Sequence, residues 1–278
     1  MNLPIHVAIC GNDNYSNYAN ALVTSILANT QSPSQITIHL FNRLTDSKIL
    51  KDLQEITMRY GAKILEYHIP IAAYRQLPAK DYKSLDAYSR LFAPRLIGEG
   101  IDRLIYIDID AIVRADLSEL VSVDLNGNTI GAVRDLEYEK GEGKSPLFNS
   151  GVMVIDVGRW KSRKIEEQVL VEIRHSQGGI VPLADQDDLN EVLRGDWLEL
   201  PLSWNVMTGS IYNKEIDYQD AKILHFNGGT LHKPDHYLCI HPGKGEYFKY
   251  LNLAKKRILP ICYIPVPVSR VLHFLSHL

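Results

Sequence analysis

Residues 101–117 read IDRLIYIDIDAIVRADL, in which an apolar run, residues 104–107, ends in two aspartates separated by one isoleucine. Because side chains alternate across a strand, Asp108 and Asp110 are expected on one side and Ile109 on the other. Residues two apart on a strand lie about 6.6 Å from each other, given a rise of about 3.3 Å per residue. The two carboxylates are therefore expected to be close neighbours.

Two ionised carboxylates at such a separation repel each other, and the nearest cations in the sequence are Arg103 and Arg114. A divalent cation bound by both carboxylates would turn this repulsion into attraction. The site would lie at the carboxyl end of a strand, where open α/β sheets bind their ligands. A second interpretation stays open, in which the strand ends in turn-forming aspartates and Asp108 caps a local backbone group.

The rest of the chain alternates between the two periodicities of strand and helix. We expect strands at residues 6–10, 36–41, 63–69, 104–107, 129–133, 151–156 and 222–226. Helices are expected around residues 18–26, 47–60, 88–97, 165–175 and 186–193. This βαβ order predicts an α/β fold with a mostly parallel sheet flanked by helices.

The composition excludes several classes of protein. The 278 residues are enough for one large domain or two small ones. Thirty Lys and Arg against 33 Asp and Glu give a net charge of −3, so no bulk charge indicates a nucleic-acid partner. Three cysteines without CxxC spacing argue against a disulfide framework or a zinc site. With no signal-peptide pattern and no apolar run of about 18 residues, we expect a cytoplasmic protein.

The last segment differs from the rest, so we divide the chain into a domain, residues 1–246, and a tail, residues 247–278. The tail has no acidic residue and five cations, Lys249, Lys255, Lys256, Arg257 and Arg270. Three prolines interrupt it, and an apolar stripe follows at residues 268, 271, 272 and 275. Two interpretations stay open: the tail attaches to the anionic inner face of a membrane, or it docks on the domain's own core.

Six segments resemble, in order, the motifs of glycosyltransferase family 8. These are AICGNDNYSNYANALVTSIL, like the first strand and loop; AYSRLFAPRLI, like the Tyr-x-Arg helix; LIYIDIDAIV with RADLSEL, like the DxD segment; LFNSGVMVIDVGRW, like FN(A/S)GV; ADQDDLN, like DQD-x-LN; and HFNGG, like HxxG. The family comprises retaining enzymes of the GT-A fold that use nucleotide sugars, including bacterial lipopolysaccharide galactosyl- and glucosyltransferases and glycogenin. The combination, over roughly residues 5–235, is specific where one motif would not be.

The resemblance implies metal-dependent retaining transfer of a hexose, glucose or galactose, from a UDP-sugar to a hydroxyl of a saccharide or glycolipid acceptor. The setting would be assembly of bacterial cell-surface polysaccharide or lipopolysaccharide. Asp108, Asp110 and His225 would bind Mn²⁺ (or Mg²⁺), and two oxygens with one imidazole suit Mn²⁺ better. Taken alone, a histidine at a strand end is a satisfied structural residue, and it is the place of His225 before Gly228 that marks it as a ligand.

The resemblance also assigns residues that would bind the donor: Asn12, Asn14, Tyr15, Arg90, Asp108, Ile109, Asn149, Gly228 and Lys233. Asn12 and Asn14 would bond uracil or ribose and Tyr15 would stack on the base. A polar turn in which Asn14 or Ser16 caps the next helix explains the asparagines almost as well. Lys233 would reach the diphosphate, although it stands two residues further along than in the family, and Asp235 replaces the family's tryptophan. His232 and His236 stay open as alternatives for this role.

Three further residues, Asp135, Asp185 and Gln186, would line the sugar pocket and take part in catalysis. Asp185 would accept hydrogen bonds from donor hydroxyls, and Gln186 would stabilise positive charge at the anomeric carbon. The acceptor hydroxyl would attack from the face that UDP leaves, with a departing phosphate oxygen as base. The alternative for ADQDDLN is the acidic first turn of a helix, which the helix dipole favours.

Two other classes of function stay open. Phosphohydrolases of the haloacid-dehalogenase type also carry DxD after an apolar strand, but that motif normally ends the first strand of the domain. A protein that binds the nucleotide sugar without transfer is the other, although four expected functional residues are intact: Asp108, Asp110, Gln186 and His225. A P-loop enzyme is excluded, because Tyr138 stands where the motif before residues 143–145 requires glycine.

Overall fold

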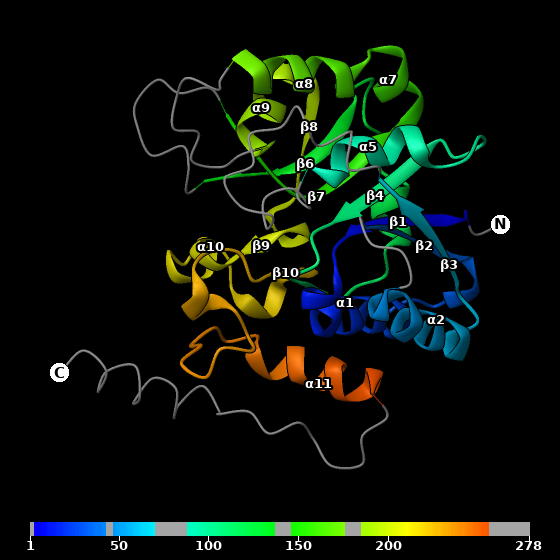
Figure 1. The fold of residues 1–278 in the computed structure, drawn as a ribbon. Helices are drawn as coiled ribbons and strands as arrows, with labels where there is room; N and C mark the ends of the chain where they lie inside the picture. Colours follow the sequence, from blue (N-terminus) through cyan, green and yellow to red (C-terminus); the bar gives the residue numbers. More distant parts are fainter. Residues whose placement is uncertain (1–2, 43–46, 70–87, 137–145, 176–184, 256–278) are drawn as a thin grey trace.

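The computed structural model describes residues 3–42, 47–69, 88–136, 146–175 and 185–255. Within these ranges the main sheet is formed by β1 (Ile5–Cys10), β2 (Ile36–Asn42), β3 (Lys63–His68), β4 (Arg103–Ile107), β6 (Ile130–Arg134), β7 (Phe148–Asp156) and β8 (Trp197–Leu200). Their spatial order is β3-β2-β1-β4-β7-β6-β8 (Figure 1). β7 is antiparallel to both β4 and β6, whereas the other neighbours are parallel. The predicted α/β class with a mostly parallel sheet is confirmed.

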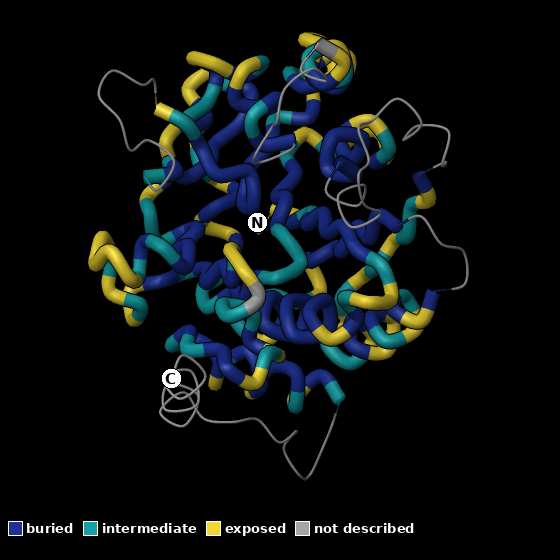
Figure 2. Tube along the Cα trace, turned by 60° about the vertical axis from the view of Figure 1, so that its left-hand side comes forward, coloured by how far each residue is buried: buried dark blue, intermediate teal, exposed yellow. Residues whose placement is uncertain are grey.

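Helices cover both faces of this sheet (Figure 1). One face carries α1 (Ser16–Ala28) and α2 (Lys48–Tyr60), and the other carries α5 (Ser89–Leu96), α7 (Val157–Ser162), α8 (Ile165–His175) and α9 (Asp185–Val192). Alternation along β1 explains the two layers, because Val7 and Ile9 pack toward α1 while Ala8 and Cys10 pack toward α5. Figure 2 shows the buried residues concentrated on the strands and on the inner sides of the helices.

A second, smaller sheet joins two distant parts of the chain. It consists of β5 (Ala111–Val113), β10 (Ile223–His225) and β9 (Val206–Met207), in the order β5-β10-β9. Ala111 pairs with His225 in an antiparallel register, and Phe226 N donates to Asp110 O at 2.9 Å. This pairing places the end of β10 beside the residues that follow β4.

All the predicted strands and helices are present, within three residues of their expected bounds. The α5 helix contains Pro94, as expected. The periodicity did not predict the shorter elements β5, β8, β9 and α7, nor α6 (Ser118–Val121), α10 (Thr208–Tyr212) and α11 (Lys244–Ala254). One expectation about the motif needs correction: β4 ends at Ile107, so Asp108 and Asp110 lie in the turn before β5 and not on a continuing strand.

The predicted boundary between residues 246 and 247 falls inside α11. This helix lies beside α1 (Figure 1), and its Tyr247 and Leu251 join Tyr18 and Ala21 of α1 in one buried cluster. Residues 247–254 therefore pack on the domain. The rest of the predicted tail, residues 256–278, lies outside the described residues. In the part of the chain that the structure describes, no helix has the length and apolar character needed to cross a membrane.

Candidate functional site

Asp108, Asp110 and His225 meet at the carboxyl end of β4, as the sequence predicted. Within the described ranges they form the one group of acidic, cysteine and histidine side chains close enough to share a metal ion, with one ligand atom of each within 4.8 Å of the others. His225 Nε2 lies 3.7 Å from Asp108 Oδ2 and 3.4 Å from Asp110 Oδ1. We call these three residues the metal corner.

The two oxygens of the Asp108 carboxylate have different partners. Its Oδ1 accepts a hydrogen bond from the Tyr106 hydroxyl at 2.6 Å and lies 3.1 Å from Arg90 Nη2. Burial raises the pKa of Tyr106 well above its ordinary value, which keeps this hydroxyl protonated as a donor. The arrangement leaves Oδ2 as the Asp108 oxygen that faces His225.

His225 is buried at the end of β10, and its Nδ1 lies 3.0 Å from Asn205 Oδ1. The close approach of its ring depends on Gly151 of β7, because a Cβ at that position would lie 2.3 Å from His225 Cε1. A steric requirement thus explains the glycine of the FNSG segment. It lets a ring from the small sheet pack directly against the large one.

Two cations balance the charges of this cluster. Lys233 Nζ forms an ion pair with Asp110 Oδ2 and donates to Phe226 O at 2.7 Å. Burial alone would raise the pKa of Asp110, but Lys233 and His225 bring it below its ordinary range. Although Lys233 stands two residues beyond the family position, its amine reaches the metal corner.

Arg90 is the second cation, and it is 5% exposed. Its Nε lies 2.8 Å from Asp185 Oδ2, and its Nη1 donates to the Ser150 carbonyl and hydroxyl oxygens, each at 2.8 Å. Burial works to lower the pKa of Arg90, but Asp108 and Asp185 raise it above the ordinary value. Arg90 is thus a buried, ion-paired group, and its guanidinium joins the metal corner to Asp185.

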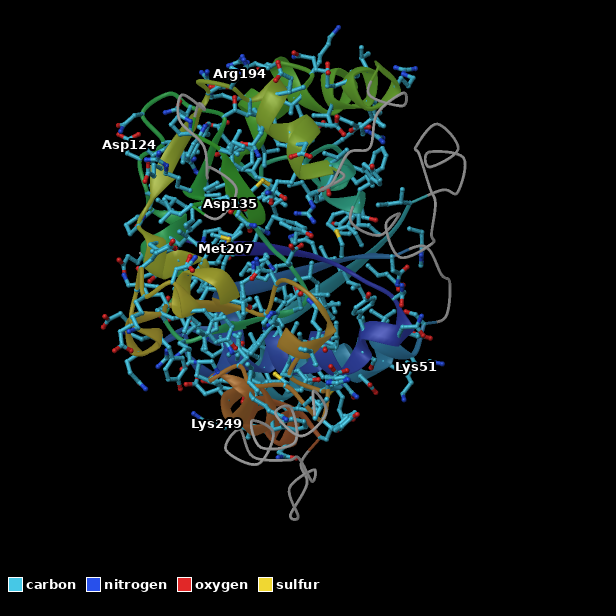
Figure 3. The ribbon with its side chains drawn as sticks, turned by 90° about the vertical axis from the view of Figure 1, so that its left-hand side faces the viewer. Lys51, Asp124, Asp135, Arg194, Met207 and Lys249 are labelled. Atoms are coloured by element: carbon cyan, nitrogen blue, oxygen red, sulfur yellow. The ribbon has the colours of Figure 1, made fainter. Side chains whose placement is uncertain are left out.

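A second cluster, which we call the amide pocket, consists of Asp135, Asn149 and Gln186. Asn149 Nδ2 lies 3.3 Å from Asp135 Oδ2 and 3.1 Å from Gln186 Oε1, and Gln186 Nε2 donates to Asp135 Oδ2 at 3.2 Å. All three side chains are buried. Figure 3 shows Asp135 in the middle part of the molecule, whereas the labelled Lys51, Asp124, Arg194 and Lys249 lie toward its edges.

An irregularity of the sheet positions this pocket. The register of β6 against β7 shifts between Ala132 and Val133, so that Val133 pairs with Asn149. Such irregularities re-aim side chains next to functional sites. The backbone N–H of Ser150 at the same place donates to Gln186 Oε1 at 3.1 Å. Asp185 and Gln186 themselves begin α9, whose acidic first turn includes Asp185, and both are buried. Their role in a sugar pocket stays a prediction.

The loop after β1 lies against the metal corner's turn. A Cβ on Gly11 would lie 2.3 Å from Ile109 Cδ1, so Ile109 packs on this loop. Asn12 Oδ1 accepts from Asn14 N at 2.9 Å and caps the short 3-10 helix Asp13–Tyr15. The expected polar turn is present, but the capping side chain is Asn12 and not Asn14 or Ser16. That the loop and Tyr15 hold a nucleoside stays a prediction.

The segment that carries Lys233 turns at Gly228, whose φ of 96° is in the left-handed region that favours glycine. Asp235, which replaces the family's tryptophan, accepts a hydrogen bond from the Tyr18 hydroxyl of α1. This contact ties the segment to the domain beyond Lys233.

Sequence reasoning missed three residues of the site: Tyr106, Ser150 and Asn205. Tyr106 had a signal, since it stands two positions before Asp108 and alternation places both on one side of β4. Ser150 lies inside a matched motif but had no assigned role. Asn205 follows Trp204 in a stretch without a recognised motif, so nothing in the sequence indicated its contact with His225.

The chain is similar to several known proteins in sequence and in fold. The profile of the family described as Glycosyl transferase family 8 matches residues 6–239. General stress protein A of Bacillus subtilis strain 168 is 30% identical over 271 residues, which cover 90% of this chain and 94% of that protein. The lipopolysaccharide 1,2-glucosyltransferase of Escherichia coli strain K12 is 28% identical over 264 residues, covering 88% and 76%. The crystal structure of the galactosyltransferase LgtC with donor and acceptor sugar analogs superposes with a TM-score of 0.78 at 22% identity, covering 90% and 96%.

Proposed function

Since the chain belongs to glycosyl transferase family 8, we propose that it is a metal-dependent retaining enzyme that transfers a hexose, glucose or galactose, from a UDP-sugar to an acceptor hydroxyl. Family membership and the GT-A fold make it a glycosyltransferase. The observation that carries the finer proposal is the metal corner joined by buried hydrogen bonds to the amide pocket.

The donor set of the metal corner fits the proposed ion. Two carboxylates and one imidazole suit Mn²⁺, whereas Mg²⁺ prefers oxygen and water. Asp108, Asp110 and His225 would hold the cation, and a Lewis acid at this place would stabilise negative charge on the leaving diphosphate. Arg90 and Lys233 supply further positive charge in direct contact with the two aspartates.

The amide pocket supports the sugar-binding part of the proposal. Asn149 and Ser150 N both donate to Gln186 Oε1, so the carboxamide is held in one orientation before any donor binds. Preorganised dipoles of this kind stabilise charge that develops in a transition state. Asp185 would orient the sugar through its hydroxyls, with Arg90 keeping its carboxylate in place. Asn12, Asn14 and Tyr15 would hold the nucleoside.

The acceptor is proposed to be a saccharide or glycolipid in the assembly of bacterial cell-surface polysaccharide or lipopolysaccharide. The support is a relative, named for lipopolysaccharide glucosyl transfer, that aligns with 88% of this chain.

The test is to incubate the full chain with UDP-glucose or UDP-galactose, with Mn²⁺ or with EDTA, and to measure released UDP. We expect release that depends on Mn²⁺ and increases with a suitable saccharide acceptor, and NMR of the product should show a retained anomeric configuration. Saturable binding without turnover would indicate a binding protein. Cleavage of phosphomonoesters without action on the sugar nucleotide would indicate a phosphohydrolase.

Attachment of the tail to an anionic membrane is also part of the proposal. Since residues 247–254 pack in α11, the segment to test begins after Lys255. Removal of residues 256–278 is expected to abolish sedimentation with anionic vesicles and to leave the reaction with soluble substrates intact. Unchanged sedimentation, or loss of folding on truncation, would favour a tail docked on the domain.

A further inference from the structure

A chain of hydrogen bonds links the backbone of β7 to the metal corner. The N–H of Gly151 donates to Asn149 Oδ1 at 3.0 Å, and Asn205 Nδ2 donates to the same oxygen at 2.8 Å. Asn205 Oδ1 then lies 3.0 Å from His225 Nδ1. Asn205 itself follows a 3-10 turn, Leu202–Trp204, and is 0% exposed.

The direction of each bond in this chain follows from its first donor. A backbone N–H can only donate, so the atom of Asn149 that meets Gly151 is its carbonyl oxygen. That oxygen must be met by the NH₂ group of Asn205, which turns the Asn205 carbonyl oxygen toward His225. Because a carbonyl oxygen can only accept, the proton of the neutral His225 ring lies on Nδ1. Its Nε2 then presents a lone pair to Asp108 and Asp110.

We propose that Asn205 is a positioning residue that holds His225 in the Nδ1–H tautomer and so makes Nε2 a metal ligand. The proposal deepens the proposed function and rests on it. Metal-bound histidines usually donate their other ring N–H to an oxygen, and loss of that partner costs about 10- to 100-fold in metal affinity. Asn205 offers this oxygen from a position that water does not reach.

The same residue connects the two parts of the site. The Asn149 carboxamide that accepts from Asn205 donates through its Nδ2 toward Asp135 and Gln186. Asn205 therefore has two separable tasks: its oxygen orients the metal ligand, and its NH₂ group fixes the amide pocket. A buried asparagine with a purely structural role would show no such separation.

The experiment measures Mn²⁺ affinity by electron paramagnetic resonance without nucleotide, together with thermal melting. Asn205→Ala is expected to weaken Mn²⁺ binding about 10- to 100-fold. In a His225→Ala background the same substitution should cause no further loss, because Asn205 acts through His225. The matched control is Asn20→Ala on α1, another buried asparagine, which donates to Asp52 and should leave Mn²⁺ affinity unchanged.

A conservative variant separates the two tasks. Asn205→Asp keeps an oxygen acceptor for His225 but cannot donate to Asn149, so Mn²⁺ binding should stay within a few-fold of wild type while UDP release falls. Should this variant fail to fold, the double-mutant cycle of Asn205→Ala and His225→Ala still tests the positioning role through Mn²⁺ affinity.

Wild-type Mn²⁺ affinity in Asn205→Ala, or an equal loss with and without His225, would overturn the positioning role while leaving the proposed function intact. If the wild-type chain itself neither bound Mn²⁺ nor released UDP, the proposed function would fail first.

Discussion

The metal corner and the amide pocket are neighbours, but they are built on different principles. In the metal corner, charged side chains from distant segments meet, and both Asp108 and Asp110 are partly exposed. In the amide pocket, buried neutral carboxamides surround one carboxylate and are fixed by backbone N–H groups of β7. In the metal corner, a metal ion could replace the Lys233 amine as the partner of Asp110. The side chains of the amide pocket are instead held in a single arrangement. Substitutions in the two regions should therefore have different signatures.

The largest effect is expected from the ligands. Asp108→Ala or Asp110→Ala should lower UDP release by on the order of 10² or more, because loss of the metal removes several kcal/mol at about 1.4 kcal/mol per tenfold. Mn²⁺ binding without nucleotide should fall in parallel. Asp124→Ala, in an exposed turn that caps Asn126 N, is the matched control and should change neither quantity. Full activity of either ligand variant would contradict the assignment.

The amide pocket should behave in the opposite way. Gln186→Ala is expected to lower turnover about 10- to 100-fold, at about 1.4 kcal/mol per tenfold, because the preorganised carboxamide is lost. Its Mn²⁺ affinity should remain that of the wild type, since Gln186 makes no contact with the three ligands among the hydrogen bonds described above. Gln168→Ala on α8 serves as control. A parallel loss of metal binding would show that the metal corner and the amide pocket act as a single unit.

Gly151 lies between the regions, and Gly151→Ala tests the steric argument. The new Cβ would lie 2.3 Å from His225 Cε1, so the ring must move and Mn²⁺ affinity should fall about tenfold, at the lower end of what disturbed ligand orientation costs. At Gly158 of α7 a Cβ would meet nothing closer than 3.5 Å. Equal metal affinities of Gly151→Ala and Gly158→Ala would show that the small sheet can move away from the new Cβ without any loss of metal binding.

The smallest effect, and the one with opposite sign, concerns Lys233. Removal of the amine that pairs with Asp110 should strengthen binding of Mn²⁺ alone by up to about fivefold, since a partly exposed ion pair is worth up to about 1 kcal/mol. Binding of UDP in the presence of Mn²⁺ should weaken, because Lys233 would otherwise turn to the diphosphate. Lys222→Ala, which removes a pair with Glu119, is the control for calorimetry. Weaker binding of Mn²⁺ alone would show that Lys233 supports the ion and does not compete with it.

The sequence predicted the regular part of the fold well, because β1 to β3 and their helices have long periodic patterns and local stop signals. One such signal is Gly61, which ends α2 at a φ of 70°. The short strands β5 and β9 have too few residues for a periodicity, and only their pairing defines them. The α11 helix was hidden because the expected tail began inside it, at residue 247, where cations without acidic residues follow, whereas its buried face packs on α1.

For the site, family motifs indicated the three residues that the structure brings together, but not the contacts that hold them. The nearest cations along the chain, Arg103 and Arg114, are not the partners of the aspartates; Arg90 and Lys233 are, and both come from other elements. The role of Asn205 depends on a turn and two hydrogen bonds to residues far away in the sequence. Such contacts are properties of the tertiary structure, so no local pattern contains them.

The central claim is that Asp108, Asp110 and His225 together bind the cation that carries the donor's diphosphate. A crystal soaked with MnCl₂ and UDP, measured at the manganese absorption edge, tests it most directly. We predict an anomalous peak in contact with Asp108 Oδ2, Asp110 Oδ1 and His225 Nε2, with Lys233 moved from Asp110 to the phosphates. Bound UDP with no manganese peak at these three atoms would contradict the claim.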